Sequence, residues 1–567
     1  MNSHNGKDKP PSSLFLRKAF IFLIFSLLSS LLFTLELNTP IPLYKEGDIA
    51  LKNIKAKEET YVPEIGITLK KDEMVIREGE RVSEEHLKKL NALRFKEEKK
   101  SDAPIRFALL TLFLFFLSVI IHEFAEKNIK KYNLSEKDLI FSLGLTLFTL
   151  ILIKGFSVFI NSFAPDLHSN LIYIAPVFFY GMLLRIVLFS EAAFVFSSIL
   201  MVCVYFIAHE VKFSIFVFLS SVLAAFFSRQ CESRNTVLKA GVYSSLISNF
   251  LLLLLSGLSD MENEHMVIRA GLVFLAGISS SFLTLGLLPV VENLFDYTTD
   301  IKLLELANLE HPLLEQMMLN APGTYHHSII VGNLCKAAAE SIGAHPLLAR
   351  VGAYYHDIGK LKMPHYFVEN RQGFEDAHKN LTPNMSALII LAHVKEGVEL
   401  AEKFKLGKKI KDIIQQHHGK SLCAYFYSRA KEQENPSVYV IEESDFRYPG
   451  PKPQTKEAGI VMLADQVEAS SRVLEDPTPK RIETHVQNII ESIFLDGQLD
   501  ECELTLKDLH AIQKSFTNIL TAMFHHRVEY PERKEYASTN NKQAEKVKNG
   551  DKTSKKSHGR IISLFRN

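Results

Sequence analysis

The sequence predicts a multi-span α-helical membrane protein with a small extracytoplasmic segment and an all-α cytoplasmic domain. Three observations lead to this prediction. The first half contains several runs that are almost free of charge and long enough to cross a bilayer core of roughly 30 Å. A polar stretch separates the first run from the others. The second half is charged, and its apolar residues recur at intervals of three and four, which is typical of amphipathic helices.

The first apolar run covers residues 15–37 and carries Arg17 and Lys18 near its start. It is long for a signal peptide, and no clear small-residue cleavage pattern follows it. We therefore interpret residues 14–37 as an uncleaved transmembrane anchor after a cytoplasmic tail of residues 1–13. Residues 38–103 form the short extracytoplasmic domain, in which "EMVIREGERVSEEHLKKLNAL" predicts a strand followed by a helix.

Seven further spans are expected within residues 104–291, which gives eight spans in total. We place them near 104–122, 137–160, 170–189, 192–208, 212–228, 238–258 and 267–291. With this count, the loops rich in Lys and Arg all fall on one side, which marks that side as cytoplasmic and puts both termini there. Lys154 and Arg185 lie in or near spans, and we interpret them as side chains that reach the membrane interface.

Residues 292–530 predict the helical cytoplasmic domain, with one candidate strand at "SVYVIE" (437–442), and residues 531–567 a disordered basic tail. The five Cys residues have neither disulfide-like nor metal-like spacing, which indicates a reducing compartment for the soluble part. The net charge of +1 indicates no general preference for DNA or RNA, so no nucleic-acid partner is expected.

Histidine is concentrated in one part of the chain, because ten of the 21 histidines fall between residues 311 and 418. The ordered set of candidate ligands is His326 or His327, then His356 with Asp357, His393, His417 with His418, and Asp465. Imidazole and carboxylate ligands without thiolate suit Mn, Fe or Zn. Six or seven ligands are too many for one ion, and they fit two ions that share a carboxylate and act on a phosphoryl centre. The later pair His525 and His526 receives no role.

This order resembles that of the HD-domain metal-dependent phosphohydrolases. The flanking motifs extend the resemblance: "APGTYHHSIIVGNL", "YYHDIGKL", "YFVENRQG", "LTPNMSALIILAHVKEGVELA", "IIQQHHG" and "FRYPGPKPQTKEAGIVMLADQVEASSR". Together with the eight-span front end, they resemble the bacterial seven-transmembrane HD-domain (PgpH-type) cyclic di-AMP phosphodiesterases over residues 14–530. The cytoplasmic part is accordingly expected to be an HD phosphohydrolase domain.

The resemblance implies two divalent metal ions, Mn or Fe, and a specific set of site residues. One ion would be held by His327, His356, Asp357 and Asp465, and the other by Asp357, His393, His417 and His418. Asp357 would bridge the ions. Lys360 would contact the scissile phosphate, where a cation one helical turn after His356 can stabilise developing charge.

The implied function is a membrane-bound phosphodiesterase of the bacterial inner membrane, in which a hydroxide bridging the two ions attacks cyclic di-AMP and yields linear pApA. Its partners would be a cyclic dinucleotide and membrane lipid, and a homodimer and an extracytoplasmic ligand are compatible with the family. Two alternatives stay open: hydrolysis of another nucleotide (ppGpp, a dNTP or cyclic di-GMP), or a non-enzymatic nucleotide-binding membrane receptor. The family pattern differs at two places, because residues 38–103 are short for its outer domain and Lys420 stands where Thr is usual.

Overall fold

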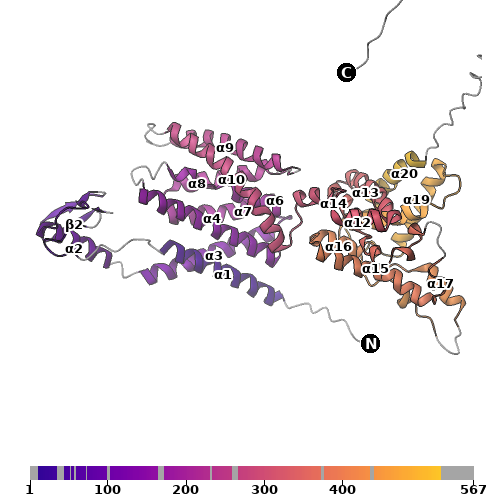
Figure 1. Ribbon diagram of the computed structural model, residues 1–567. Helices are drawn as coiled ribbons and strands as arrows, with labels where there is room; N and C mark the ends of the chain where they lie inside the picture. Colours follow the sequence, from indigo (N-terminus) through magenta and orange to yellow (C-terminus); the bar gives the residue numbers. More distant parts are fainter. Residues whose placement is uncertain are drawn as a thin grey trace, which may run out of the picture.

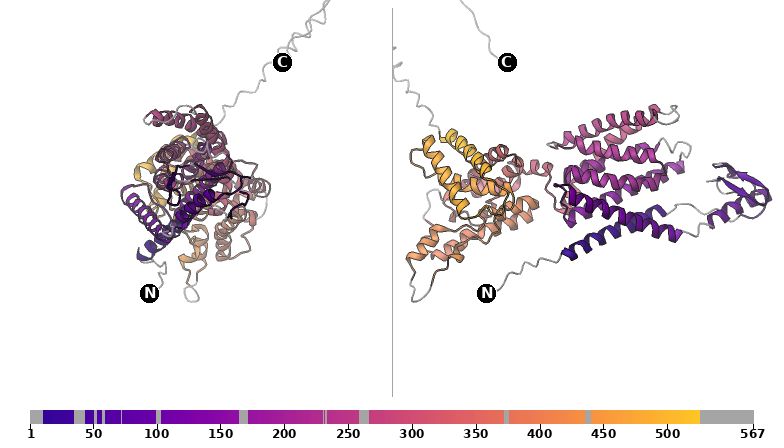
Figure 2. Two further views of the ribbon diagram at one scale, coloured as in Figure 1. Left: turned by 90° about the vertical axis from the view of Figure 1, so that its left-hand side faces the viewer. Right: turned by 180° about the vertical axis from the view of Figure 1, so that it is seen from behind.

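The computed structural model describes residues 11–34, 44–50, 53–56, 59–71, 73–98, 103–163, 171–229, 231, 233–257, 266–371, 376–434 and 440–524. They form a small β-containing domain, a bundle of apolar helices and a C-terminal helical domain (Figure 1). The small domain and the C-terminal domain lie at opposite ends of the bundle in all side views (Figure 2). The predicted basic tail, residues 531–567, lies outside these ranges.

Within the described ranges, the bundle contains six helices that are long and apolar enough to cross a membrane, together with two shorter apolar segments, Ile172–Val187 and Val211–Phe227. These eight segments correspond to the eight predicted spans. Their elements are α1 (Pro11–Thr34), α3 (Ala103–Asn128), α4 (Glu136–Phe163), η2 (Ile172–Ile174), α6 (Phe178–Val187), α7 (Ser190–Ala208), α8 (Val211–Phe227), α9 (Arg234–Gly257) and α10 (Met266–Phe295).

The predicted span 170–189 is not one continuous helix, which corrects the sequence-based interpretation. Pro176 separates η2 from α6, and the preceding Ala175 has an extended backbone (φ −55°, ψ 129°) as residues before proline usually do. Arg185 lies in the last turn of α6 and donates to the carbonyl of Arg229 at 3.1 Å, which fits a helix-end side chain. Helix α6 ends at Val187 and α7 begins at Ser190, so the turn between them is very short.

The small domain has its own apolar core, which includes the fully buried Ala56, Val62 and Leu69. Strand β1 (Ile54–Lys55) pairs with β4 (Met74–Ile76), and β2 (Thr60–Val62) pairs with β3 (Ile67–Leu69), both antiparallel. Helix α2 (Glu84–Glu98) follows β4. The predicted strand followed by a helix is therefore confirmed.

The C-terminal domain is helical, as predicted, and its core is separate from that of the bundle. Its helices are α11 (Asp300–Leu306), α12 (Pro312–Asn320), α13 (Pro322–Ile342), α14 (Pro346–Tyr355), α15 (Pro383–Lys403), α16 (Lys408–Gln416), α17 (Ala424–Glu432), α18 (Lys456–Ser471), α19 (Pro479–Leu495) and α20 (Leu506–Phe524). Short 3₁₀ turns follow α14 at Ile358–Lys362 (η4), Pro364–Tyr366 (η5) and Val368–Asn370 (η6), and precede α18 at Glu443–Phe446 (η7). The candidate strand at 437–442 is wrong for residues 440–442, which form no strand. Residues 437–439 lie outside the described ranges.

Candidate metal centre

Two short helices end at the centre of the C-terminal domain, and each delivers an adjacent pair of candidate ligands. Helix α14 ends at Tyr355, so that His356 and Asp357 follow directly, and α16 ends at Gln416, so that His417 and His418 follow. Three longer helices supply the other candidates: His327 on α13, His393 on α15 and Asp465 on α18. All seven of the predicted ligand residues thereby converge on one place, whereas His326 is exposed.

The seven residues form two sets of four that share Asp357. One set is His327, His356, Asp357 and Asp465, the other Asp357, His393, His417 and His418, and within each set one donor atom per residue lies within 4.8 Å of the others. The two carboxylate oxygens of Asp357 face different sets. Oδ1 lies 3.4 Å from His393 Nε2 and 3.7 Å from His417 Nε2. Oδ2 lies 3.3 Å from His356 Nε2. This arrangement would allow Asp357 to contribute one oxygen to each of two ions.

Backbone carbonyls orient three of the imidazoles in the same way. Nδ1 of His356, His393 and His417 lies 2.7, 2.6 and 2.7 Å from the carbonyl oxygen three residues earlier. A carbonyl only accepts, so each Nδ1 carries a proton, and in the neutral form of each ring Nε2 directs a lone pair into the cluster. Among the described residues, His356 Nε2, His418 Nδ1 and Asp357 Oδ1 are buried without a hydrogen-bond partner, and Asp357 Oδ2 forms an ion pair with Lys360. Bound divalent cations would satisfy these atoms, so the donor set fits such ions.

The electrostatics of the cluster also suit cations. Burial lowers the pKa of His393 and His417, and it lowers that of His418 to about 3, so these imidazoles are neutral. Burial disfavours the charged forms of Asp357 and Asp465, but the neighbouring histidines, and Lys360 beside Asp357, hold both pKa values well below the usual range. The site therefore combines ionised carboxylates with three neutral imidazoles, those of His393, His417 and His418.

Glu468 is a residue of the cluster that the sequence interpretation missed. It lies one helical turn after Asp465 on α18, is buried, and brings Oε2 to 2.5 Å from Nδ1 of His327. Arg472 donates to both oxygens of Glu468 and fixes its position. Because Glu468 binds Nδ1, Nε2 of His327 is directed towards Asp465, 3.0 Å away. A carboxylate behind a ligating histidine sets the ring orientation and increases its basicity.

Glu468→Gln is expected to weaken metal binding by roughly 10- to 100-fold, since a neutral amide polarises His327 less than a carboxylate does. The measurement is competition for Mn²⁺ against a fluorescent chelator. Glu483→Gln, a change at an exposed carboxylate that pairs with Lys480, is the matched control and should bind like the wild type. Equal affinities in Glu468→Gln and the control would show that Glu468 does not support the centre.

Lys360 lies beside the centre, and its partner Glu369 was also missed. Lys360 Nζ lies 2.7 Å from Asp357 Oδ2 and donates to Glu369 Oε1 at 2.8 Å. Thr324 on α13 donates to the same oxygen at 3.0 Å. Burial opposes the charge on Lys360, but Asp357 and Glu369 raise its pKa, so it remains a cation. Glu369 lies within the motif "YFVENRQG", but its 3₁₀ turn has no periodic pattern that would point to a role for this residue.

A membrane-spanning helical bundle joined to a helical domain with a buried His/Asp cluster defines a class: membrane proteins with an HD-type hydrolase domain. The family model described as "7TM receptor with intracellular HD hydrolase" matches residues 105–299, and the HD domain model matches residues 324–470. The chain belongs to this family of seven-transmembrane HD proteins. The HD domain implies binding of divalent metal.

Two curated relatives are both named "Cyclic-di-AMP phosphodiesterase PgpH". The protein from Bacillus subtilis (strain 168) is 35% identical over 479 residues, which cover 82% of this chain and 65% of the relative. The protein from Listeria monocytogenes serotype 1/2a (strain 10403S) is 35% identical over 489 residues, which cover 85% of this chain and 66% of the relative. The chain thus matches slightly less than two thirds of either relative's length. A crystal structure of the L. monocytogenes PgpH HD domain in complex with cyclic-di-AMP is 46% identical, with a TM-score of 0.37, covering 39% of this chain and 100% of that chain.

Proposed function

We propose that this protein is a metal-dependent phosphodiesterase that hydrolyses cyclic di-AMP to linear pApA. The observation that carries the proposal is the pair of buried donor sets that share Asp357. The seven ligand residues are assigned as in the two sets above, with Mn or Fe as the ions because the donors are imidazole and carboxylate without thiolate. The choice of cyclic di-AMP is supported by the names of the two curated relatives.

The residues of the chain would divide the work as follows. Two bound divalent cations would activate water and offset negative charge at the phosphorus. Asp357 contributes one oxygen to each donor set and holds the two sets in a fixed spacing. Lys360 carries a permanent positive charge next to that bridge, where a buried ammonium stabilises charge that develops on a phosphate oxygen. Glu369 keeps the ammonium in place until the phosphate arrives.

We further propose that the HD domain and the N-terminus face the cytoplasm at a bacterial inner membrane. The loop before α4 carries Lys130 and Lys131, and the loop before α9 carries Arg229. Both loops lie at the HD end of the bundle, because Lys137 donates to the carbonyl of Phe295 and Arg234 pairs with Glu305. Basic loops collect on the cytoplasmic side.

The test uses the full chain in nanodiscs, loaded with Mn²⁺ or Fe²⁺, and assays cyclic di-AMP, cyclic di-GMP, ppGpp and dGTP side by side. Production of pApA that stops after chelation supports the proposal. Turnover of ppGpp, dGTP or cyclic di-GMP without cyclic di-AMP would refute the substrate assignment. Binding of nucleotide without hydrolysis in the metal-loaded protein would identify a receptor instead of an enzyme.

Metal affinity is expected to increase with pH. In the metal-free site, burial disfavours the charged form of His356, but Asp357 and Asp465 outweigh it and raise its pKa to about 10. His356 is then protonated at neutral pH, and this proton must leave before Nε2 can bind a cation. Below that pKa, apparent affinity should rise by up to about tenfold per pH unit for each displaced proton. Mn²⁺ titrations at several pH values check this, and a flat profile contradicts it.

A further inference from the structure

The segment 292–306 joins the last membrane helix to the HD domain, and we call it the junction. We propose that the junction couples the membrane bundle to the metal centre by holding the N-terminal ends of α14 and α16, the two helices whose opposite ends carry the ligand pairs. The inference rests on the metal site of the proposed function and is independent of the substrate.

The membrane side of the junction is fixed by the start of α4. Tyr297 donates from its hydroxyl to Asp138 Oδ1 at 2.6 Å. Lys137 donates to the carbonyl of Phe295 at 2.8 Å, and its ammonium lies 4.1 Å from the centroid of the Tyr297 ring. The Phe141 ring of α4 contacts the rings of Phe295 and Tyr297 edge-on. The junction will therefore follow a displacement of α4 or α10.

On the other side, three consecutive residues each serve the start of a different helix. Thr299 is the N-cap of α11, where its hydroxyl accepts from the amide of Lys302. Thr298 accepts from the amide of Lys409 at 3.4 Å in the first turn of α16, whose own N-cap residue is Gly407 and provides no side-chain cap. A helix start needs such acceptors for its free amides. The junction thus supplies to α16 a cap that α16 lacks.

The third residue, Asp300, acts on α14. The N-cap of α14 is His345, whose Nδ1 accepts from the amide of Leu348 at 3.2 Å. With Nδ1 as acceptor, Nε2 carries the proton and donates to Asp300 Oδ1, 3.0 Å away. Asp300 therefore fixes the ring that caps α14. The start of α16 also lies close to the junction. An added Cβ on its N-cap residue Gly407, which has a φ of +90°, would lie 2.5 Å from Thr298 Oγ1.

Helices α14 and α16 can transmit a displacement because they are short and tightly packed. They have ten and nine residues, so their ends are roughly 15 Å apart. An added Cβ on Gly352 of α14 would lie 2.5 Å from Ile413 Cδ1 of α16, which shows how closely they pack. Four of the seven candidate ligands follow these two helices, whereas the others come from α13, α15 and α18. A shift of the pair would change the spacing of both donor sets.

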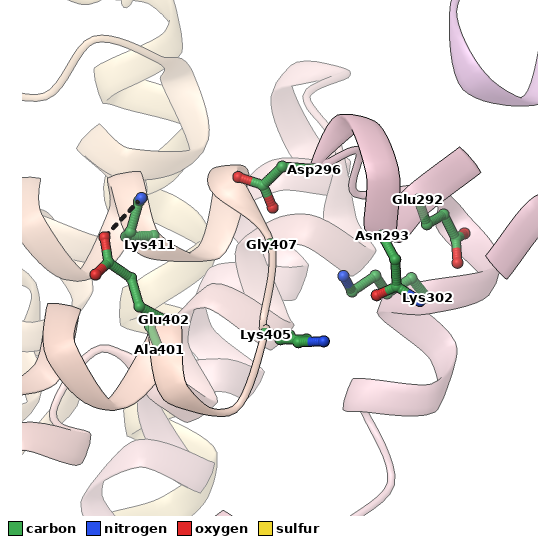
Figure 3. A pocket seen from close by; sticks show the side chains of 9 residues that line it. All are labelled: Glu292, Asn293, Asp296, Lys302, Ala401, Glu402, Lys405, Gly407 and Lys411. Carbon is green, nitrogen blue, oxygen red and sulfur yellow. Dashed lines mark hydrogen bonds and ion pairs between the residues drawn. The ribbon is translucent and has the colours of Figure 1, made fainter. Parts of the chain in front are cut away.

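A cavity of about 330 Å³ beside these contacts gives the junction room to move. Figure 3 shows Glu292, Asp296 and Lys302 on the junction side. Glu402, Lys405 and Lys411 line it from the HD side, where Lys411 pairs with Glu402 at 3.0 Å. Charged walls allow water to enter, so this part of the interface is not a dry packed core.

The test compares full-length variants in nanodiscs by Mn²⁺ affinity and by nucleotide turnover. Tyr297→Phe removes the hydroxyl that binds Asp138 on the membrane side of the junction. Thr298→Val removes the acceptor for α16, while Thr298→Ser keeps it. Glu305→Gln is the matched control. Glu305 also joins the junction to the bundle, through Arg234 of α9, but this pair is exposed, and exposed ion pairs contribute little.

We expect Tyr297→Phe and Thr298→Val to change Mn²⁺ affinity by about threefold or more, with unchanged far-UV circular dichroism. Thr298→Ser and Glu305→Gln should behave like the wild type. If Tyr297→Phe binds Mn²⁺ and turns over nucleotide like Glu305→Gln, the coupling is refuted, even if Thr298→Val fails to fold. A wild-type protein that binds no Mn²⁺ would instead refute the metal centre itself.

Discussion

Asp357→Asn is expected to reduce hydrolysis by roughly 1000-fold or more and to weaken both metal sites together. The reason is geometric, because Asp357 is the residue common to the two donor sets, and its two oxygens face different sets. The Asn side chain has one oxygen and no charge. At most one of the two donor sets would therefore keep an oxygen ligand at this position, and that ligand would be neutral. Turnover of cyclic di-AMP and the number of bound Mn²⁺ ions per chain are the measurements.

The matched control for this change is Asp500→Asn. Asp500 is exposed and pairs with Lys452, so its loss should leave both turnover and ion number unchanged. Substantial hydrolysis by Asp357→Asn at normal ion content would contradict the shared-carboxylate centre. Loss of activity in the control as well would indicate a general effect on folding.

Gly359→Ala is expected to lower the stability of the protein and weaken metal binding, because it disturbs the packing of η4 against α15. A Cβ at Gly359 would lie 1.8 Å from the carbonyl oxygen of His393 and 2.6 Å from the amide of Gly397, both in the backbone of α15. Helix α15 would have to retreat from η4, and His393 would move with it. Such overpacking destabilises by about 1–3 kcal/mol or more, so thermal unfolding should occur several degrees lower and Mn²⁺ binding should weaken.

Gly144→Ala provides the comparison for Gly359→Ala. An added Cβ at Gly144 meets no atom within 4 Å, so this change should leave thermal unfolding and Mn²⁺ binding as in the wild type. A Gly359→Ala protein with the stability and affinity of Gly144→Ala would contradict the close contact between η4 and α15.

The sequence was sufficient for those features that depend on local pattern. Long apolar runs marked all eight segments of the bundle, and only the break at Pro176 required the structure, although proline is a local signal for it. The order of His and Asp residues pointed to the seven residues that converge. Their assignment as ligands nevertheless came from a resemblance, since spacing alone does not say which imidazoles meet.

Long-range pairing is what the sequence could not reveal. His327 and Glu468 are 141 residues apart, and no periodicity relates them, although the one-turn spacing from Asp465 to Glu468 could have drawn attention to that face of α18. The junction shows the same limit, because a threonine that caps a helix more than 100 residues later looks like an ordinary linker residue. Such contacts depend on how the helices pack, not on local propensity.

The most direct test of the central claim is an equilibrium Mn²⁺ titration of the full-length wild type, followed by a structure with anomalous scattering at the Mn edge. The account predicts two bound ions per chain, on opposite sides of the Asp357 carboxylate, and their simultaneous loss in Asp357→Asn. A single ion, or two ions that Asp357 does not connect, would contradict it.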